Sequence, residues 1–121
     1  MTLYKLTNEL IVNVEDAVKR YENMREFDLE PDFFTEVKPY ADGFLERLKA
    51  WEESAKIYVA EYSPKYFHHM QIINIMDAME QLIVQSFYKK TSKKRFMDSA
   101  RSVEYSLRKL KRYLEEDGLH V

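Results

Sequence analysis

The sequence predicts an all-α protein, an up-and-down bundle of four helices with a short helical turn in the connection between the first two. Apolar residues recur every three or four positions in four long runs, which is the period of helices that bury one face. The chain of 121 residues also holds only two glycines and three prolines, so a helix must end at few points. This length suits one core, and we expect residues 1–121 to form a single domain.

The first predicted helix begins near Leu3 and ends near Arg25. A break follows at residues 27–31, after which Asp32 can cap a short helical turn over residues 33–37. The sequence leaves open whether this turn packs as a lid or fills the end of the bundle. The apolar stripe of the first helix comprises Leu3, Leu6, Leu10, Val14, Ala17, Tyr21 and Met24.

Pro39 marks the start of the second predicted helix, because proline has no N–H to donate and its ring disfavours helical geometry at the residue before it. Ser63 and Pro64 are expected to end this helix and to start the next one at once, with Ser63 as the N-cap. A connection this short makes the two helices antiparallel neighbours. The stripe of the second helix comprises Phe44, Leu48, Trp51, Ala55, Tyr58 and Tyr62.

The third helix is predicted over residues 65–88, as the most buried of the four. His68 falls on its apolar side, where we expect a core-edge histidine bonded to a backbone or tyrosine partner. Ser86 falls on the same side and is expected to bond back to a carbonyl of the preceding turn. The apolar face comprises Ile72, Ile75, Met76, Met79, Leu82, Ile83 and Phe87.

The fourth helix shows the clearest pattern. Thr91 or Ser92 can cap its start, and Gly118 can adopt the left-handed conformation that ends it near Asp117. Leu119 is then expected to fold back on the last residue of the stripe. Helices of about 23 to 26 residues with steps of three and four predict packing at a shallow angle. The stripe comprises Phe96, Ala100, Val103, Leu107, Leu110 and Leu114.

The composition excludes several classes of protein. There is no cysteine, which rules out disulfides, thiolate catalysis and cysteine-ligated metal centres. The first nine residues lack the basic start and apolar run of a signal peptide. No segment approaches the roughly 20 apolar residues of a membrane span. We therefore expect a cytoplasmic protein that does not enter a membrane.

Several strings of residues resemble a known family. They are residues 33–42 (FFTEVKPYAD), Trp51, residues 85–88 (QSFY) followed by residues 94–96 (KRF), and residues 102–107 (SVEYSL). Their order resembles that of the YppE-like proteins, small uncharacterised cytoplasmic proteins of Gram-positive bacteria of the Bacillus and Listeria type, over nearly the whole chain. The resemblance implies a four-helix bundle and implies no activity, ligand or partner.

The usual marks of a catalytic or metal site are missing from the sequence. A di-metal bundle needs Glu-x-x-His motifs, and none occurs here. His68 and His69 diverge by about 100° on a helix, so they do not easily share a metal ion. Ser86 lies about 27 Å from His68 along one helix axis, which is too far for a dyad. We therefore predict no catalytic, cofactor-binding or metal-binding residues.

One surface feature remains as a candidate site. Residues 89–112 contain ten basic residues and only two acidic ones, Asp98 and Glu104. Part of this charge forms an outward stripe on the fourth helix, opposite its core face. An ordinary solvated face would also show ion pairs between residues four positions apart, here Glu104 with Arg108, Lys111 with Glu115 and Arg112 with Glu116. The candidate partner contact comprises Lys94, Arg101, Tyr105, Arg108 and Arg112.

Three functions follow as hypotheses. The first is a non-enzymatic interaction module that presents this stripe to an unknown protein partner. The second is a nucleic-acid-binding protein that uses the same stripe, against which the net charge of −2 and the pI near 5.9 argue. The third is a metal-binding or enzymatic bundle, which needs His68 to meet carboxylates from the second or fourth helix. The sequence gives neither the partner nor the oligomeric state.

Overall fold

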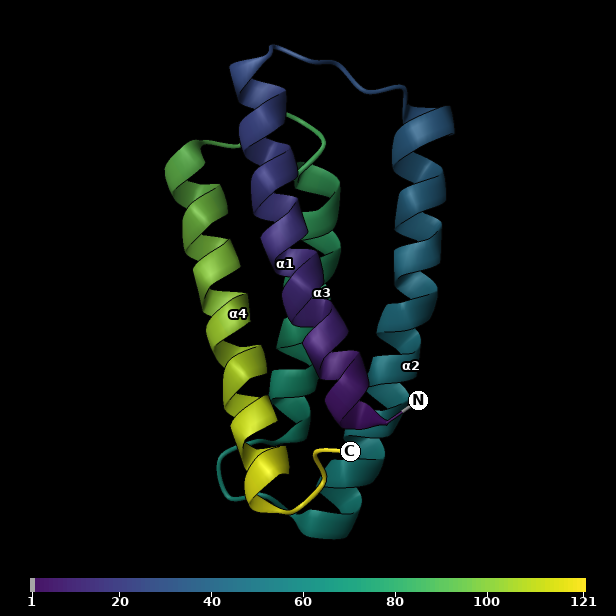
Figure 1. The fold of residues 1–121 in the computed structure, drawn as a ribbon, viewed down its shortest axis with the longest axis vertical. Coiled ribbons are helices and arrows are strands. Elements are labelled where there is room, and N and C mark those ends of the chain that lie inside the picture. Colours follow the sequence, from purple (N-terminus) through teal and green to yellow (C-terminus); the bar gives the residue numbers. More distant parts are fainter. Residues whose placement is uncertain (1) are drawn as a thin grey trace.

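Four helices run side by side along the long axis of the molecule (Figure 1). The chain direction reverses from each helix to the next, so the predicted up-and-down four-helix bundle is confirmed. The computed structural model describes residues 2–121. Its helices are α1 (Leu3–Glu26), the five-residue π-helix η1 (Phe33–Val37), α2 (Lys38–Tyr62), α3 (His69–Gln85) and α4 (Lys93–Glu116).

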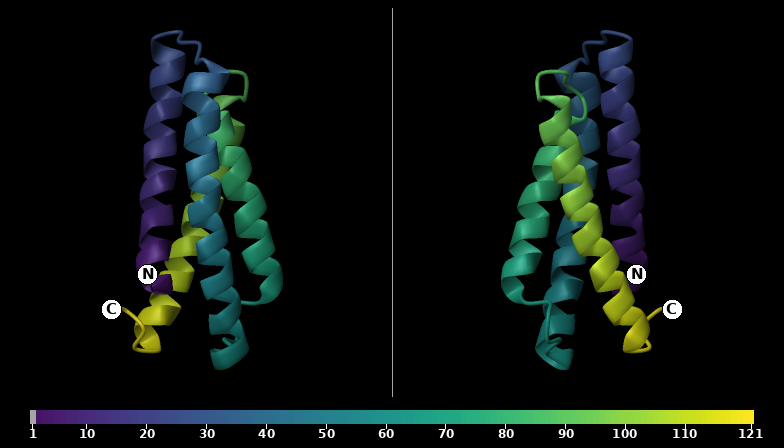
Figure 2. Two further views of the ribbon diagram at one scale, coloured as in Figure 1. Left: turned by 90° about the vertical axis from the view of Figure 1, so that its right-hand side faces the viewer. Right: turned by 90° about the vertical axis from the view of Figure 1, so that its left-hand side faces the viewer.

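Most of the core is one continuous cluster to which all four long helices contribute, and Met24, Val37 and Phe87 form a second, smaller cluster. α1 packs against each of the other three, while α2 packs on α3 and α3 on α4. Tyr21, Trp51 and Phe96 are its largest fully buried side chains, and the rings of Tyr21 and Phe96 stack with their centroids 4.0 Å apart. Figure 2 shows that the α1–α2 and α3–α4 connections lie at the same end of the bundle.

The predicted stripes of α1 and α4 are confirmed. All six residues of the α4 stripe are buried, and in α1 only Leu3 is half-buried. In α2 the stripe is confirmed up to Tyr58, but Tyr62 is 45% exposed, so its prediction as a core residue was wrong. Tyr62 lies in the last turn of α2 and stacks on Tyr58.

The connection between α1 and α2 closes one end of the bundle. Asp32 caps η1 as predicted, because its Oδ1 accepts hydrogen bonds from the backbone N–H groups of Phe34 (2.9 Å) and Thr35 (3.0 Å). The bond from Thr35 helps to hold the pKa of Asp32 below its ordinary value. Val37 is buried, whereas Phe33 and Phe34 are exposed. The turn therefore fills the end of the bundle through Val37 alone and does not cover it as a lid.

α2 begins near Pro39, as predicted, but no break separates it from the turn before it. Lys38 has helical angles (φ −62°, ψ −48°) although a proline follows, and its N–H donates to the carbonyl of Phe33 across the wide π turn. Pro39 lies in the first turn of α2, where a missing N–H costs least. η1 and α2 therefore form one continuous helical path.

The predicted connection between α2 and α3 was right about the end of α2 and wrong about the start of α3. Ser63 does not cap α3; it adopts the left-handed conformation (φ 44°, ψ 54°) that ends α2. α3 has 17 residues, so it is shorter than predicted at both ends. The helices are nevertheless packed neighbours that run in opposite directions, as expected.

His68 is exposed, so its prediction as a core-edge histidine was also wrong. It is the N-cap residue of α3, and the neighbouring Phe67 is the side chain that enters the core, with 2% of its surface exposed. Gln71 fixes this turn, because its side-chain oxygen accepts from the His68 N–H and its Nε2 donates to the carbonyl of Tyr66 at 2.9 Å.

Both ends of α4 follow the prediction. The hydroxyl of Ser92 accepts from the N–H of Arg95 at 3.2 Å. Gly118 has a φ of 74°, which lets the Leu119 N–H donate to the carbonyl of Leu114 at 2.8 Å. Leu119 packs against the core cluster that contains Leu114.

Alkaline pH is expected to destabilise the bundle through Tyr58. Its hydroxyl donates to Oδ2 of Asp117 at 2.6 Å, and burial together with this carboxylate raises the pKa of Tyr58 well above 10.0. The folded state therefore holds this proton more tightly than the unfolded state does. The resulting stability is complete below about pH 10 and falls above it by at most about 1.4 kcal/mol per pH unit.

Chemical unfolding of the wild type and of Tyr58→Phe at about pH 8 and about pH 11 measures this contribution. All residues other than the one at position 58 are the same in both proteins, so the comparison isolates that position. The wild type should lose more free energy of unfolding than the variant between the two conditions. Equal losses would show that Tyr58 does not couple folding to pH.

Candidate functional site

The basic stripe, defined as Lys94, Arg101, Tyr105, Arg108 and Arg112, lies on the outer face of α4. All five residues are exposed, and the core residues of the same helix point in the opposite direction. Tyr105 stands out because a tyrosine on a bundle helix usually packs at the rim, whereas 68% of this one is exposed. The stripe is therefore an accessible row of cations around one aromatic ring.

The ion pairs divide the stripe into a middle and two ends. Arg108 pairs with Glu104 of its own helix (Nε to Oε2, 3.5 Å) and with Glu15 of α1 (Nη2 to Oε1, 3.6 Å), so it also joins two helices. Of the three predicted pairs, that of Glu104 with Arg108 is confirmed, whereas within residues 2–121 neither Lys111 with Glu115 nor Arg112 with Glu116 forms an ion pair. Arg101 approaches Asp98 at 3.7 Å. The middle of the stripe is thus partly neutralised.

The two ends of the stripe keep their charge. Among residues 2–121, neither Lys94 nor Arg112 forms an ion pair. The Arg112 guanidinium lies 6.0 Å from the centre of the Tyr113 ring, a contact that leaves its charge uncompensated. Since 18 residues separate the two cations, they lie about 27 Å apart along α4. A surface that complements them must be of similar length.

A set of exposed apolar residues was not found by the sequence reasoning. Phe27, Leu29, Phe33 and Phe34 in the α1–α2 connection are 46% to 76% exposed, and the rings of Phe33 and Phe34 meet edge to face at 5.3 Å. The sequence carried a signal for them, because these large apolar residues lie outside every predicted stripe. We call these four residues the connection cluster.

A half-buried arginine was also missed. Nε of Arg20 donates to Oγ of Ser86 at 2.8 Å, and its guanidinium lies 4.6 Å from the ring centre of Tyr40 and 4.3 Å from that of Phe87. Its Nη2 is buried and has no hydrogen-bond partner in the part of the chain that the structure describes. This cation joins α1, α2 and the turn after α3.

Among residues 2–121, the structure places no catalytic base or acid next to Ser86. As predicted, its hydroxyl bonds back within its own helix, donating to the carbonyl of Ile83 at 2.6 Å. The same oxygen accepts from Arg20, so both of its roles in hydrogen bonding are taken by structural partners. His68 is at the other end of α3 and exposed.

Metal and membrane sites receive no support from the described part of the chain. Residues 2–121 contain no cluster of three or more histidine, aspartate or glutamate residues placed to hold a metal ion. None of the helices formed by these residues has the length and apolar character needed to cross a membrane. The candidate site therefore rests on the basic stripe.

Comparison with known proteins gives one consistent family. Residues 7–114 match the model of a family described as a bacterial domain of unknown function, DUF1798. The chain is 33% identical over 110 residues to the uncharacterized protein YppE of Bacillus subtilis. The matched region covers 91% of this chain and 89% of that protein. The resemblance to YppE-like proteins is thereby confirmed.

Solved structures agree with this similarity. The crystal structure of YppE from Bacillus subtilis aligns with a TM-score of 0.90 at 30% identity, covering 96% of this chain and 94% of that one. A protein of unknown function from Listeria innocua aligns with a TM-score of 0.90 over 98% of this chain and 94% of its own, and at 24% identity it supports the fold alone. These relatives carry no assigned activity.

Proposed function

The chain belongs to the DUF1798 family of bacterial domains of unknown function, and from this premise we propose that it is a cytoplasmic, non-enzymatic module that binds a protein partner through the basic stripe of α4. The observation that supports this function best is the exposed ring of Tyr105, with Arg101 one turn before it and Arg108 one turn after it. Tyrosine and arginine are the residues that most often supply the binding energy at the centre of protein interfaces.

The charge distribution favours a protein over a nucleic acid as the partner. Arg101 and Arg108 already have carboxylates nearby, whereas a surface that follows a phosphate backbone needs unneutralised cations along its length. The whole chain is also slightly acidic, with a net charge of −2. Free cations at the two ends suit a partner with separated acidic groups and an apolar site for the Tyr105 ring.

Capture from a lysate of the native cells is expected to depend on Tyr105. A tagged wild-type chain should retain a protein that Tyr105→Ala and Arg101→Glu lose, because truncating a central aromatic weakens binding by about 30-fold or more. Arg108 is left intact, since it also holds α1 to α4. Quantitative mass spectrometry of nuclease-treated and untreated halves measures the retained protein.

Two variants serve as matched controls. Phe34→Ser removes an aromatic ring of the connection cluster that is even more exposed than Tyr105, and Lys49→Glu reverses an exposed charge on α2. Both should retain the partner. A partner lost with Phe34→Ser but kept with Tyr105→Ala would move the contact to the connection cluster. Binding that disappears with nuclease and falls steeply with salt would replace the proposal by nucleic-acid recognition.

A further inference from the structure

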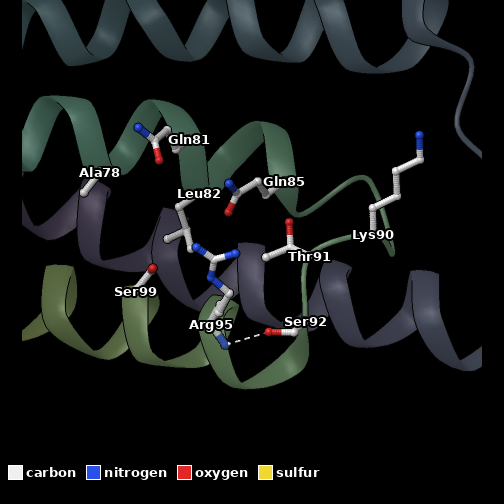
Figure 3. A pocket seen from close by; sticks show the side chains of 9 residues that line it. All are labelled: Ala78, Gln81, Leu82, Gln85, Lys90, Thr91, Ser92, Arg95 and Ser99. Atoms are coloured by element: carbon white, nitrogen blue, oxygen red, sulfur yellow. Dashed lines mark hydrogen bonds between the residues drawn. The ribbon is translucent and has the colours of Figure 1, made fainter.

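A polar cavity of about 570 Å³ lies between α3 and α4, next to the connection that joins them (Figure 3). α3 contributes Gln81 and Gln85, and α4 contributes Arg95 and Ser99. In each pair the residues are four positions apart, so both side chains of a pair lie on the same face of their helix. The cavity is of the size that small-molecule sites usually have.

Arg95 is an uncompensated cation in this cavity. Figure 3 shows its side chain extending from α4 towards Gln85 and Leu82 of α3, whereas Lys90 points away from it at the rim. None of the nine lining residues is acidic, and within residues 2–121 the Arg95 guanidinium forms neither an ion pair nor a hydrogen bond. Its position in the first turn of α4 also opposes the helix dipole. The fold therefore gains little from this charge.

Several of the neutral lining residues can donate hydrogen bonds from their side chains. Gln81 and Gln85 each carry an amide NH₂ group, and Thr91 and Ser99 carry hydroxyls. The connection that presents Thr91 is held in place, because the carbonyl of Thr91 accepts a hydrogen bond from the buried hydroxyl of Tyr21. Together with the forked guanidinium these groups offer more donors than the two oxygens of a carboxylate can use. A phosphate group has three terminal oxygens for them.

The geometry points to a binding site for a small anion that carries a phosphate group, with Arg95 as its ionic anchor. The amides of α3 and the hydroxyls of Thr91 and Ser99 complete its coordination. The remaining volume holds the organic part of a phosphate monoester. This site is independent of the partner contact at Tyr105, so either can fail without the other.

Titration of ¹⁵N-labelled protein with inorganic phosphate, at constant ionic strength in chloride, tests the site. Amide signals of Gln85, Thr91 and Ser99 should shift and saturate. Arg95→Gln should raise the dissociation constant by about ten-fold or more, because a charged hydrogen-bonded anchor is lost. Arg101→Gln removes another exposed arginine of the same helix and should leave the constant within about two-fold.

A second variant should also weaken phosphate binding, by adding a negative charge to the cavity. Ser99→Glu adds a carboxylate to the cavity, four residues after Arg95, and should abolish the shifts by repelling the anion and pairing with the guanidinium. Phenyl phosphate binding more tightly than inorganic phosphate would identify a monoester as the ligand, and equal affinities would identify free phosphate. Shifts that do not saturate, acetate binding as well as phosphate, or equal effects of Arg95→Gln and Arg101→Gln would overturn the site.

Discussion

Replacing Trp51 with alanine is expected to lower the free energy of unfolding by about 3–5 kcal/mol, a large part of the about 5–15 kcal/mol that holds a domain of this size together. Trp51 is fully buried at the centre of the core, and its Nε1 donates to Oγ1 of the equally buried Thr7 at 3.1 Å. The variant loses the packing of the ring and leaves a cavity. Urea unfolding followed by far-UV circular dichroism measures the loss, since Trp51 is the only tryptophan and fluorescence would disappear with it.

The hydrogen bond between Trp51 and Thr7 contributes to the free energy of unfolding separately from the packing of the indole ring. Thr7→Val keeps the shape of the side chain and leaves the indole N–H buried without an acceptor, which should cost about 1–3 kcal/mol. The double variant Trp51→Ala, Thr7→Val should cost less than the sum of the two single changes, because the second change no longer strands a donor. Additive losses would contradict a hydrogen bond between the two side chains.

Ser86→Ala is expected to destabilise the protein by about 1–3 kcal/mol although it removes a single oxygen atom. The loss arises at Arg20, whose Nε loses its acceptor while its Nη2 already has none. The guanidinium of Arg20 is half-buried between the rings of Tyr40 and Phe87. Without the hydroxyl of Ser86 it loses its side-chain hydrogen bond. Thermal and urea unfolding of the variant measure the loss.

A second substitution shows whether Ser86→Ala destabilises the protein through the loss of the Arg20 hydrogen bond or through the loss of packing at position 86. Arg20→Met keeps an apolar stem between the two rings and removes the charge, and such replacements of buried ionic groups are often neutral or stabilising. Adding Arg20→Met to Ser86→Ala should therefore recover most of the lost stability. If the double variant were as unstable as Ser86→Ala alone, the loss would come from packing around position 86 and not from the stranded arginine.

The helices were predictable because their apolar residues follow one period. Residues of the α4 stripe, from Phe96 to Leu114, repeat at steps of three and four, and no other regular structure buries such a pattern along one line. The caps at Asp32 and Ser92 and the end of α4 at Gly118 were predictable for a similar reason, since each depends on a residue type that suits one local geometry.

The start of α3 was not predictable from local signals. Ser63 and Pro64 suit the start of a helix as well as the end of one, and the tertiary structure decides between the two. Burial of Phe67 in the core requires an extended segment before His69, and this burial moves the helix start by several residues. A periodic pattern cannot show which of the neighbours Phe67 and His68 enters the core.

The candidate sites depend on how the helices are aligned with one another, and a single sequence does not specify this alignment. Periodicity places Arg101 and Tyr105 outside, but the pair of Arg108 with Glu15 depends on how α4 is aligned with α1. The cavity at Arg95 likewise requires its face of α4 to oppose Gln85 of α3, which lies outside the predicted apolar face of that helix. Arg20 lies beside the α1 stripe, where a long side chain can turn inwards or outwards.

Photo-crosslinking from position 105 tests the proposed function most directly. Tyr105→p-benzoylphenylalanine places the reactive group at the centre of the basic stripe, and the same group at Lys49 on α2 is the control. We expect one discrete protein adduct in living cells from position 105, absent from position 49 and unaffected by nuclease. No adduct from position 105, or the same adducts from both positions, would contradict the assignment of the outer face of α4 as the partner contact.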